Sequence, residues 1–225
     1  MTARYRTRPG GGIKPSEIAF FTAEMDVEVQ PDMSVMPTYK TVMVLKNGEA
    51  CKYVNVPPSD MDVAAHKQAH PGKWGTWRQR GRTYERLSSK GEWKKVDWKL
   101  RLYPARPGDE LRGKLTRTSA SVVPGGGDAS TAVASVNSFV FLPGRRFRDE
   151  RFASVSHHAG TSGGRSGVSM SSRDEDEKDG TYVLDGTTLE LRYSDGTVDR
   201  RAFLWTSEKR TGSVVLNTSV YLLKD

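Results

Sequence analysis

Apolar and polar side chains alternate along two well-defined stretches of the chain. Across 95–102 and 187–193, one set of alternate residues is mainly apolar or aromatic and the other set is charged or hydroxylated. A period of two is that of a β-strand with one buried face and one solvated face. On the first stretch, the predicted buried face carries Val96, Trp98, Leu100 and Leu102. The pattern predicts strands in an antiparallel sheet.

Turn signals separate these short runs. Asn-Gly stands at 47–48, and Asp-Gly stands at 185–186 and 195–196. Such pairs favour tight hairpin turns. One helix is predicted, over about 60–69, because Ser59 and Asp62 resemble a capping box. The proline at position 71 would end it. We expect an all-β fold of antiparallel meanders with one short helix.

Residues 153–179 differ from the rest of the chain. They are rich in Ser and Gly and finish in the acidic run 174–177. This composition is typical of a segment that buries little apolar surface. We expect a mobile surface loop here.

The meander is predicted to occur twice. Gly75-Thr76-Trp77 is followed by glycines four and fourteen residues after the Trp, and Gly180-Thr181-Tyr182 is followed by glycines at the same spacings. Upstream, 43–48 matches 139–144, which aligns Cys51 with Phe147. Matched landmarks in the same order indicate an internal duplication. The duplicated units would form one barrel-like body or two packed β-domains.

The repeated unit resembles a lipocalin-like β-meander of uncharacterised bacterial proteins, in which a G-T-[YW] triplet precedes Asp-Gly turns. The triplet at 75–77 is also similar to the G-x-W opening of lipocalins. This resemblance implies a barrel or a sandwich, and it implies no particular ligand.

The charge of the chain is concentrated in two places. The 225 residues carry a net charge of +8. Residues 1–16 hold four bases and no acid, whereas 73–117 hold fourteen bases and five acids, a net +9. We divide the chain into a flexible basic arm (1–16), a first β repeat (17–117) and a second β repeat (118–225). The arm would make electrostatic contacts with a partner through Arg4, Arg6, Arg8 and Lys14.

The repeat also singles out a candidate binding site. Arg86 aligns with Leu191, so an arginine stands where the other copy places a core residue. A buried guanidinium needs an anion, a carboxylate or an aromatic face. One interpretation places Arg86, Tyr84 and Trp77 in a polar cavity for an anionic ligand. The alternative is a β-bulge that turns Leu87 inward instead.

Aromatic residues lie among the bases of the first repeat. Trp74 and Trp93 have no aromatic counterpart in the second repeat, so we expect them to be exposed. Cations beside stacking platforms are typical of single-stranded nucleic acid binding, and they also suit an acidic protein surface. The alternative is that the tryptophans belong to the core and the bases to the solvated face.

Little in the sequence indicates catalysis or metal binding. Asp62, His66 and His70 share one helix face, but they are weak metal candidates because a tetrahedral site needs a fourth ligand. The G-x-S-x-G match at 160–164 lies in a Ser/Gly tract without the strand–turn–helix setting of a hydrolase. No nucleotide or dinucleotide motif is present, so we expect no cofactor. A single cysteine excludes an internal disulfide.

These observations predict a non-enzymatic binding protein that takes an anionic or amphipathic small molecule, or an acidic protein surface, through its first repeat. The predicted ligand-binding residues are Trp74, Trp77, Tyr84, Arg86 and Trp93. The alternative is a nucleic-acid-binding module that uses the surface of 73–117. No run approaches the ~20 apolar residues of a membrane helix, and the first 15 residues contain no signal-peptide pattern. We expect a protein that stays in the cytoplasm, leaves by a route needing no such signal, or has lost a leader.

Overall fold

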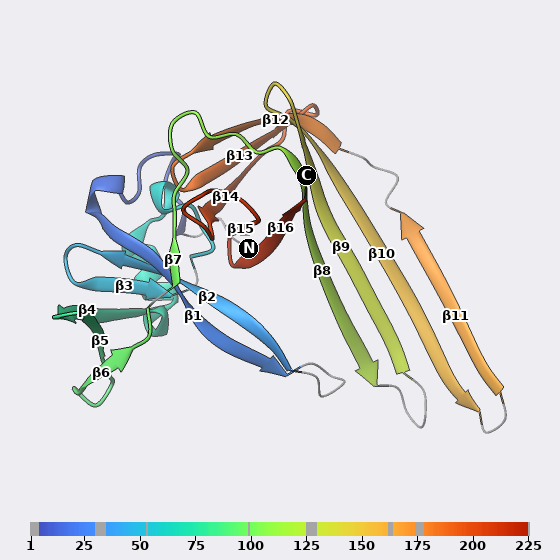
Figure 1. Ribbon diagram of the computed structural model, residues 1–225, viewed down its shortest axis with the longest axis horizontal. Helices are drawn as coiled ribbons and strands as arrows, with labels where there is room; N and C mark the ends of the chain where they lie inside the picture. Colours follow the sequence, from blue (N-terminus) through green and yellow to red (C-terminus); the bar gives the residue numbers. More distant parts are fainter. Residues whose placement is uncertain are drawn as a thin grey trace.

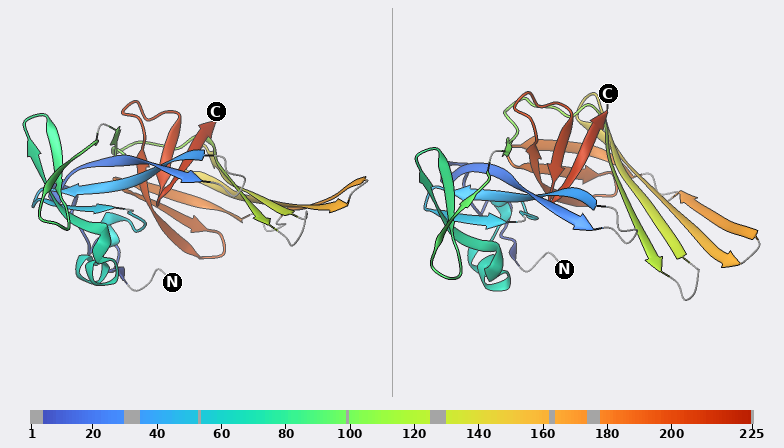
Figure 2. Two further views of the ribbon diagram at one scale, coloured as in Figure 1. Left: turned by 90° about the horizontal axis from the view of Figure 1, so that it is seen from below. Right: turned by 60° about the horizontal axis from the view of Figure 1, so that its bottom comes forward.

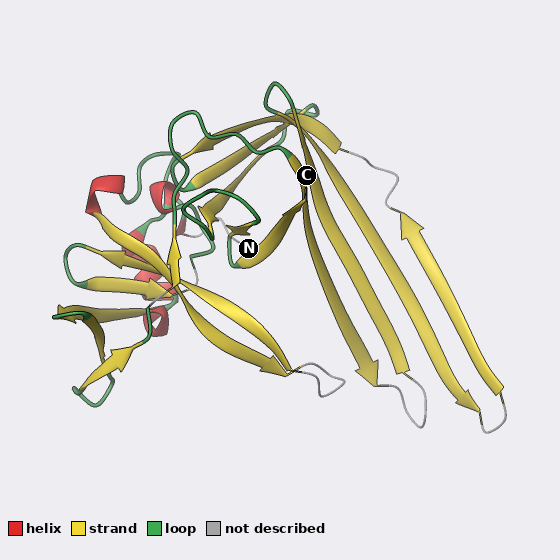
Figure 3. Cartoon of the chain, in the orientation of Figure 1, coloured by secondary structure: helices red, strands yellow, loops and turns green. Residues whose placement is uncertain are grey.

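A computed structural model describes residues 5–29, 35–52, 54–98, 100–124, 130–161, 164–173 and 178–224. Strands dominate it, and the single α-helix lies beside the first sheet (Figure 3). The predicted all-β class is confirmed. Within the described ranges, no helix is long and apolar enough to cross a membrane.

The first half of the chain forms a seven-stranded antiparallel sheet with the order β6-β5-β4-β3-β2-β1-β7 (Figure 1). Strands β6 and β7 lie at opposite edges although they are close in sequence. The segment between them leads from the edge beside β5 to the edge beside β1. The sheet therefore curls around its own small core. Its strands are β1 (Ile18–Val29), β2 (Val35–Leu45), β3 (Glu49–Lys52), β4 (Trp74–Arg80), β5 (Thr83–Leu87), β6 (Trp93–Val96) and β7 (Leu100–Leu102).

The second half forms a closed antiparallel barrel. Strand β9 pairs with both β8 and β10, and this closes the circle of eight strands. Fifteen buried residues fill the barrel, among them Leu189, Leu191 and Phe203. Its strands are β8 (Gly113–Pro124), β9 (Ser130–Leu142), β10 (Arg146–Thr161), β12 (Lys178–Asp185), β13 (Thr188–Tyr193), β14 (Val198–Trp205), β15 (Ser213–Leu216) and β16 (Ser219–Lys224).

A ninth strand, β11 (Gly164–Arg173), pairs with β10 beyond the barrel wall. Together, β8, β9, β10 and β11 extend away from the barrel as a long ribbon (Figures 1 and 2). The prediction of a loop at 153–179 is therefore wrong for most of its length, because 153–161 and 164–173 pair residue by residue. Backbone pairing needs no hydrophobic pattern, which explains why composition missed it. Residues 162–163 and 174–177 lie outside the described residues.

The two units pack through a shared apolar layer. Ala202, Leu204 and Val215 of the barrel's outer face join a cluster that includes Phe21 and Met43 of the first sheet. An ion pair reinforces this contact: Arg200 donates to the Asp60 carboxylate from Nε at 2.7 Å and from Nη2 at 3.0 Å. Since Asp60 is 2% exposed, the pair joins the two units where water has little access.

The same order of paired strands occurs in both halves of the chain. The order β1-β2-β3-β4-β5-β6 recurs as β8-β9-β10-β12-β13-β14. Trp77 lies opposite Arg86 as Tyr182 lies opposite Leu191. The sequence boundary at 117/118 needs correction, because it falls inside β8, which pairs along its length with β9. The boundary between the two sheets lies between β7 and β8.

The hairpin alignment also needs a shift of one residue. Val44 lies opposite Ala50, and Phe141 lies opposite Phe147 with the same number of residues between them. The counterpart of Phe147 is thus Ala50 rather than Cys51. Cys51 itself is fully buried in the layer between the units, and burial raises the pKa of its thiol to about 12.

Two local predictions also change. The expected continuous strand at 95–102 is divided into β6 and β7, and Leu100 is exposed. The helix is shorter than expected: α1 spans Val63–Ala69, and Asp62 caps it by accepting from the Ala65 backbone N–H at 3.0 Å.

The N-terminal segment is packed rather than free. The Thr7 N–H donates to the Asp60 carbonyl at 2.8 Å, the Ile13 N–H donates to the Pro58 carbonyl at 2.8 Å, and Ile13 is buried. The expectation of a flexible arm does not match these contacts. Ile13 and the backbone N–H donors hold the segment in place. The number of basic residues, on which the expectation was based, does not predict such contacts.

Candidate functional site

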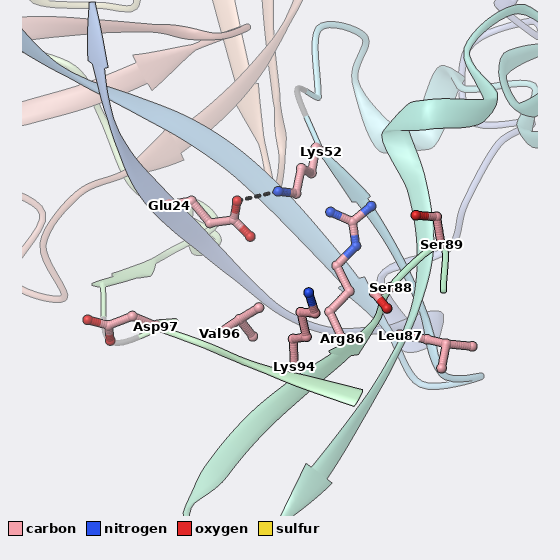
Figure 4. A pocket seen from close by; sticks show the side chains of 9 residues that line it. All are labelled: Glu24, Lys52, Arg86, Leu87, Ser88, Ser89, Lys94, Val96 and Asp97. Atoms are coloured by element: carbon pink, nitrogen blue, oxygen red, sulfur yellow. Dashed lines mark hydrogen bonds and ion pairs between the residues drawn. The ribbon is translucent and has the colours of Figure 1, made fainter. Parts of the chain in front are cut away.

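A cavity of about 630 Å³ opens inside the curl of the first sheet. Its lining comes from β1, β3, β5 and β6 and from the residues that follow β5 and β6 (Figure 4). The lining residues are Glu24, Lys52, Arg86, Leu87, Ser88, Ser89, Lys94, Val96 and Asp97. Three cations therefore meet two carboxylates in one open space.

An aromatic cluster lies beside the cavity inside the same sheet. The rings of Phe20, Trp77, Tyr84 and Trp98 have centroids 5.2–6.1 Å apart. They pack with Val42, Val44 and Ala50 in a small core. Because strand residues alternate between faces, Arg86 shares the inner face with Tyr84, two positions away. The aromatic cluster thus forms the packed base beside the polar residues that line the cavity.

The Arg86 guanidinium, which lines the cavity, lies against Gly75 on the neighbouring strand β4. A Cβ at Gly75 would lie 2.6 Å from Arg86 Nε, so a larger residue at this position would displace the guanidinium from where it lies. Arg86 Nη2 makes a long hydrogen bond of 3.4 Å to the Trp74 carbonyl. Among the described residues, no carboxylate lies within ion-pair distance of Arg86. Its positive charge acts on Glu24 across the cavity, where it helps to lower the pKa of that carboxyl.

Glu24 is already held by other donors. Its carboxylate accepts from the Lys52 ammonium, and the Trp98 indole N–H donates to its Oε1 at 3.0 Å. Burial alone would raise the pKa of Glu24, but these hydrogen bonds and the nearby positive charges lower it on balance. Glu24 is therefore a carboxylate that orients Lys52, and with a lowered pKa it is a weak base.

The five predicted ligand-binding residues do not converge. Arg86 lines the cavity, with no bulge in the β5 pairings, while Trp77 and Tyr84 pack in the core beside it. Trp74 instead donates from its indole N–H to His66 Nδ1 at 3.0 Å. Trp93 lies elsewhere, 4.1 Å below the Arg78 guanidinium. Trp74 and Trp93 are half-buried rather than exposed as expected, and neither lines the cavity.

The predicted electrostatic contacts lie apart from the cavity. Arg6 donates to the Arg200 carbonyl at 3.3 Å, at the contact between the units. Arg8 and Lys14 are exposed, and Arg4 lies outside the described residues. None of the described three lines the cavity.

The weak metal candidates have other roles. Asp62 caps the helix. His66 Nδ1 accepts a hydrogen bond from an indole, which is a donor only, so the neutral ring carries its proton on Nε2. Binding a metal through Nε2 would move that proton to Nδ1 and oppose the Trp74 N–H. Across the part of the chain that the structure describes, no three His, Cys, Asp or Glu side chains gather as a metal site.

Sequence reasoning missed Lys52, Lys94 and Glu24. They join Arg86 only through strand pairing: Lys94 lies opposite Arg86 on β6, and Lys52 follows Ala50 on the inner face of β3. A comparison of the two repeats, position by position, could have identified the two lysines. The pairings show that Lys52 and Lys94 stand where the barrel carries Asp149 and Asp199.

Comparison with family models, curated proteins and solved structures finds no match for this chain. The site is therefore interpreted from its own geometry.

Proposed function

We propose that this protein binds a small anionic molecule in the cavity of its first sheet and does not transform it. The observation that carries the proposal is Arg86, a half-buried guanidinium that faces the cavity without a carboxylate partner. A guanidinium presents paired donors that suit carboxylates and phosphates. Lys94 adds positive charge from β6, and Lys52, which Glu24 holds in place, adds a further hydrogen-bond donor from β3.

The remaining lining suits a ligand that is polar at one end. Ser88 and Ser89 offer hydroxyls, while Val96, opposite Tyr84 on the inner face of β6, offers apolar surface. The volume lies within the range of small-molecule sites. An anion with a short apolar part, such as a medium-chain carboxylate or a phosphate monoester, would use both kinds of surface.

Calorimetric titration tests the proposal with three probes: inorganic phosphate, citrate and octanoate. The wild-type protein should bind at least one of them, and Arg86→Leu should weaken that binding roughly 10- to 100-fold, since hydrogen bonds to charged groups contribute about 1.5–3 kcal/mol. The matched control is Arg78→Leu. It removes the same charge from the outer side of the sheet, where Arg78 pairs with Glu85 at 2.7 Å.

The outcomes separate cleanly. Loss of binding in Arg86→Leu, with a folded protein and with Arg78→Leu unaffected, supports the cavity. Equal binding in both variants, or no binding by wild-type protein, would overturn it.

A nucleic-acid interface would use the other face of β4–β6, where the Arg78 guanidinium stacks on Trp93. Titration with a random single-stranded oligonucleotide at low and high salt distinguishes the two sites. Strong, salt-sensitive binding that Arg78→Leu loses and Arg86→Leu retains would favour this alternative.

A further inference from the structure

Four strands continue beyond the barrel as a ribbon that no other described strand covers. Strand β16 pairs with β8 only at Lys114–Thr116, and β12 pairs with β10 only at Arg146–Asp149. Past these points, β8, β9, β10 and β11 pair among themselves (Figure 1). The ribbon therefore has two edges that the barrel does not cover.

One edge is the outer side of β8 at 117–124, and the other is the outer side of β11 at 164–173. In the described parts of the chain, no strand pairs with either edge. Each edge presents a row of backbone N–H and C=O groups that are ready to pair with another strand.

Charged residues stand only towards the ends of the two free edges, at Arg117 on β8 and at Arg165 and Arg173 on β11. Segments 118–124 and 166–172 contain no charged residue, and a single proline stands at the end of the first. The pairings of β8 with β9 and of β10 with β11 run without a register shift. Proteins that stay monomeric protect such edges with lysines, prolines or bulges. Two long, regular edges with uncharged central segments favour pairing with another strand.

The two edges also fit each other. With four antiparallel strands, the first and the last run in opposite directions. The β11 edge of one copy placed beside the β8 edge of a second copy therefore continues the antiparallel pattern, over uncharged segments of equal length. Within one copy the two edges are three strand spacings apart, about 14 Å, and cannot pair.

We propose that copies of this chain assemble head to tail, with the β8 edge of one copy hydrogen-bonded to the β11 edge of the next. The occupant is a second copy because each chain supplies one edge of each kind, so every edge is satisfied when copies repeat. A contact of this type closes into a ring or continues as a filament, depending on the rotation between copies.

Disulfide trapping tests this directly. The chain has one cysteine, Cys51, which is buried, so Cys51→Ala supplies a background without thiols. Into it, Ser119→Cys on β8 is combined in turn with Ser166→Cys, Ser169→Cys or Ser171→Cys on β11, which samples the register. Because disulfides require Cα atoms closer than about 7 Å, these pairs can form only between copies.

The matched control is Ser154→Cys with Ser171→Cys, which are direct partners on β10 and β11 of one chain. Mild oxidation of the control should give a cross-linked monomer. At least one β8–β11 pair should instead give a ladder of covalent oligomers, and wild-type protein should sediment as an oligomer. A protein that stays monomeric at about 100 μM with no ladder from any pair would overturn the proposal.

Two single proline variants, Val168→Pro and Ser169→Pro, add an independent test. Neighbouring residues of a strand direct their N–H groups to opposite sides, so one variant affects β10 and the other affects the free edge. One of the two should lose assembly while keeping the barrel's thermal unfolding transition. Undiminished assembly in both would contradict edge pairing.

Discussion

The two units share one meander and differ at three equivalent inner positions. The first sheet carries Arg86, Lys52 and Lys94, and these line its cavity. The barrel carries Leu191, Asp149 and Asp199 at the matching places of its pairing pattern. Three cations in one unit thus correspond to an apolar residue and two acids in the other.

In the barrel these positions are filled and satisfied from within. Leu191 is fully buried. The Tyr193 hydroxyl donates to Asp149 at 3.1 Å, and Arg201 pairs with Asp199 at 2.7 Å while lying over the Phe139 ring. The same strand arrangement is therefore a packed core in one copy and an open cationic mouth in the other. The barrel and the first sheet therefore differ more in the charge of these inner residues than in the arrangement of their strands.

The harshest test transfers the arginine to the barrel. Leu191→Arg places a charge with no partner inside a filled core, and we expect the free energy of unfolding to fall by about 4–5 kcal/mol. Urea unfolding measures it. The control is Leu222→Arg, since Leu222 is 55% exposed on the same barrel. Equal effects at both positions would contradict the filled interior.

The contact between the units comes next. Asp60→Asn removes the bidentate partner of Arg200, which keeps its second partner Glu190, and should lower stability by about 2 kcal/mol. Burial raises the pKa of Asp60, but hydrogen bonds from Arg200, Gly10 and Ser59 lower it on balance. Because the folded pKa is the lower one, this stabilisation is present above about pH 4 and is lost as the pH falls further. Chemical unfolding across pH should show this loss in the wild type and not in the variant.

His66 should give the first unit a second dependence on pH. Burial, with His70 and Lys73 nearby, lowers its pKa to about 4. The unfolded chain then binds the proton more readily, so stability is full above about pH 6.5 and falls as the pH drops towards 4, by about 2 kcal/mol at pH 5. The slope of unfolding free energy between pH 5 and pH 7 should flatten in His66→Gln. An unchanged slope would mean that another group titrates.

The smallest expected effect concerns the rim of the cavity. Lys94 is exposed and lies 3.9 Å from Glu92. Lys94→Gln should weaken phosphate binding about two- to fivefold at low salt and less at high salt, since exposed charges are screened. Titrations at two salt concentrations measure this. A loss as large as that of Arg86→Leu would show that the rim, rather than the interior, holds the anion.

Much of the framework was readable from sequence for physical reasons. Asp-Gly pairs marked turns that need a left-handed residue, and Gly186 and Gly196 have φ of 52° and 84°. The matched triplets predicted the repeated strand order. The comparison of Arg86 with Leu191 indicated the inner position where the cavity lies.

The remainder depended on pairing between distant strands. No local pattern shows that Glu24 reaches Lys52, because their strands meet only in the folded sheet. The alternating pattern predicted one continuous strand through Trp98. In the structure the chain at Trp98 instead passes from β6 at one edge of the sheet to β7 at the other. The ribbon was missed because Ser/Gly-rich strands pair through their backbone.

The most direct test of the central claim is a ¹⁵N–¹H spectrum of arginine side chains during titration with the anion that binds most tightly. If the open cationic mouth is the site, the Arg86 Nε–H resonance should shift and saturate with the calorimetric affinity, while that of Arg201 in the barrel stays in place. An unmoved Arg86 signal at saturating ligand, or equal shifts in both units, would contradict the account.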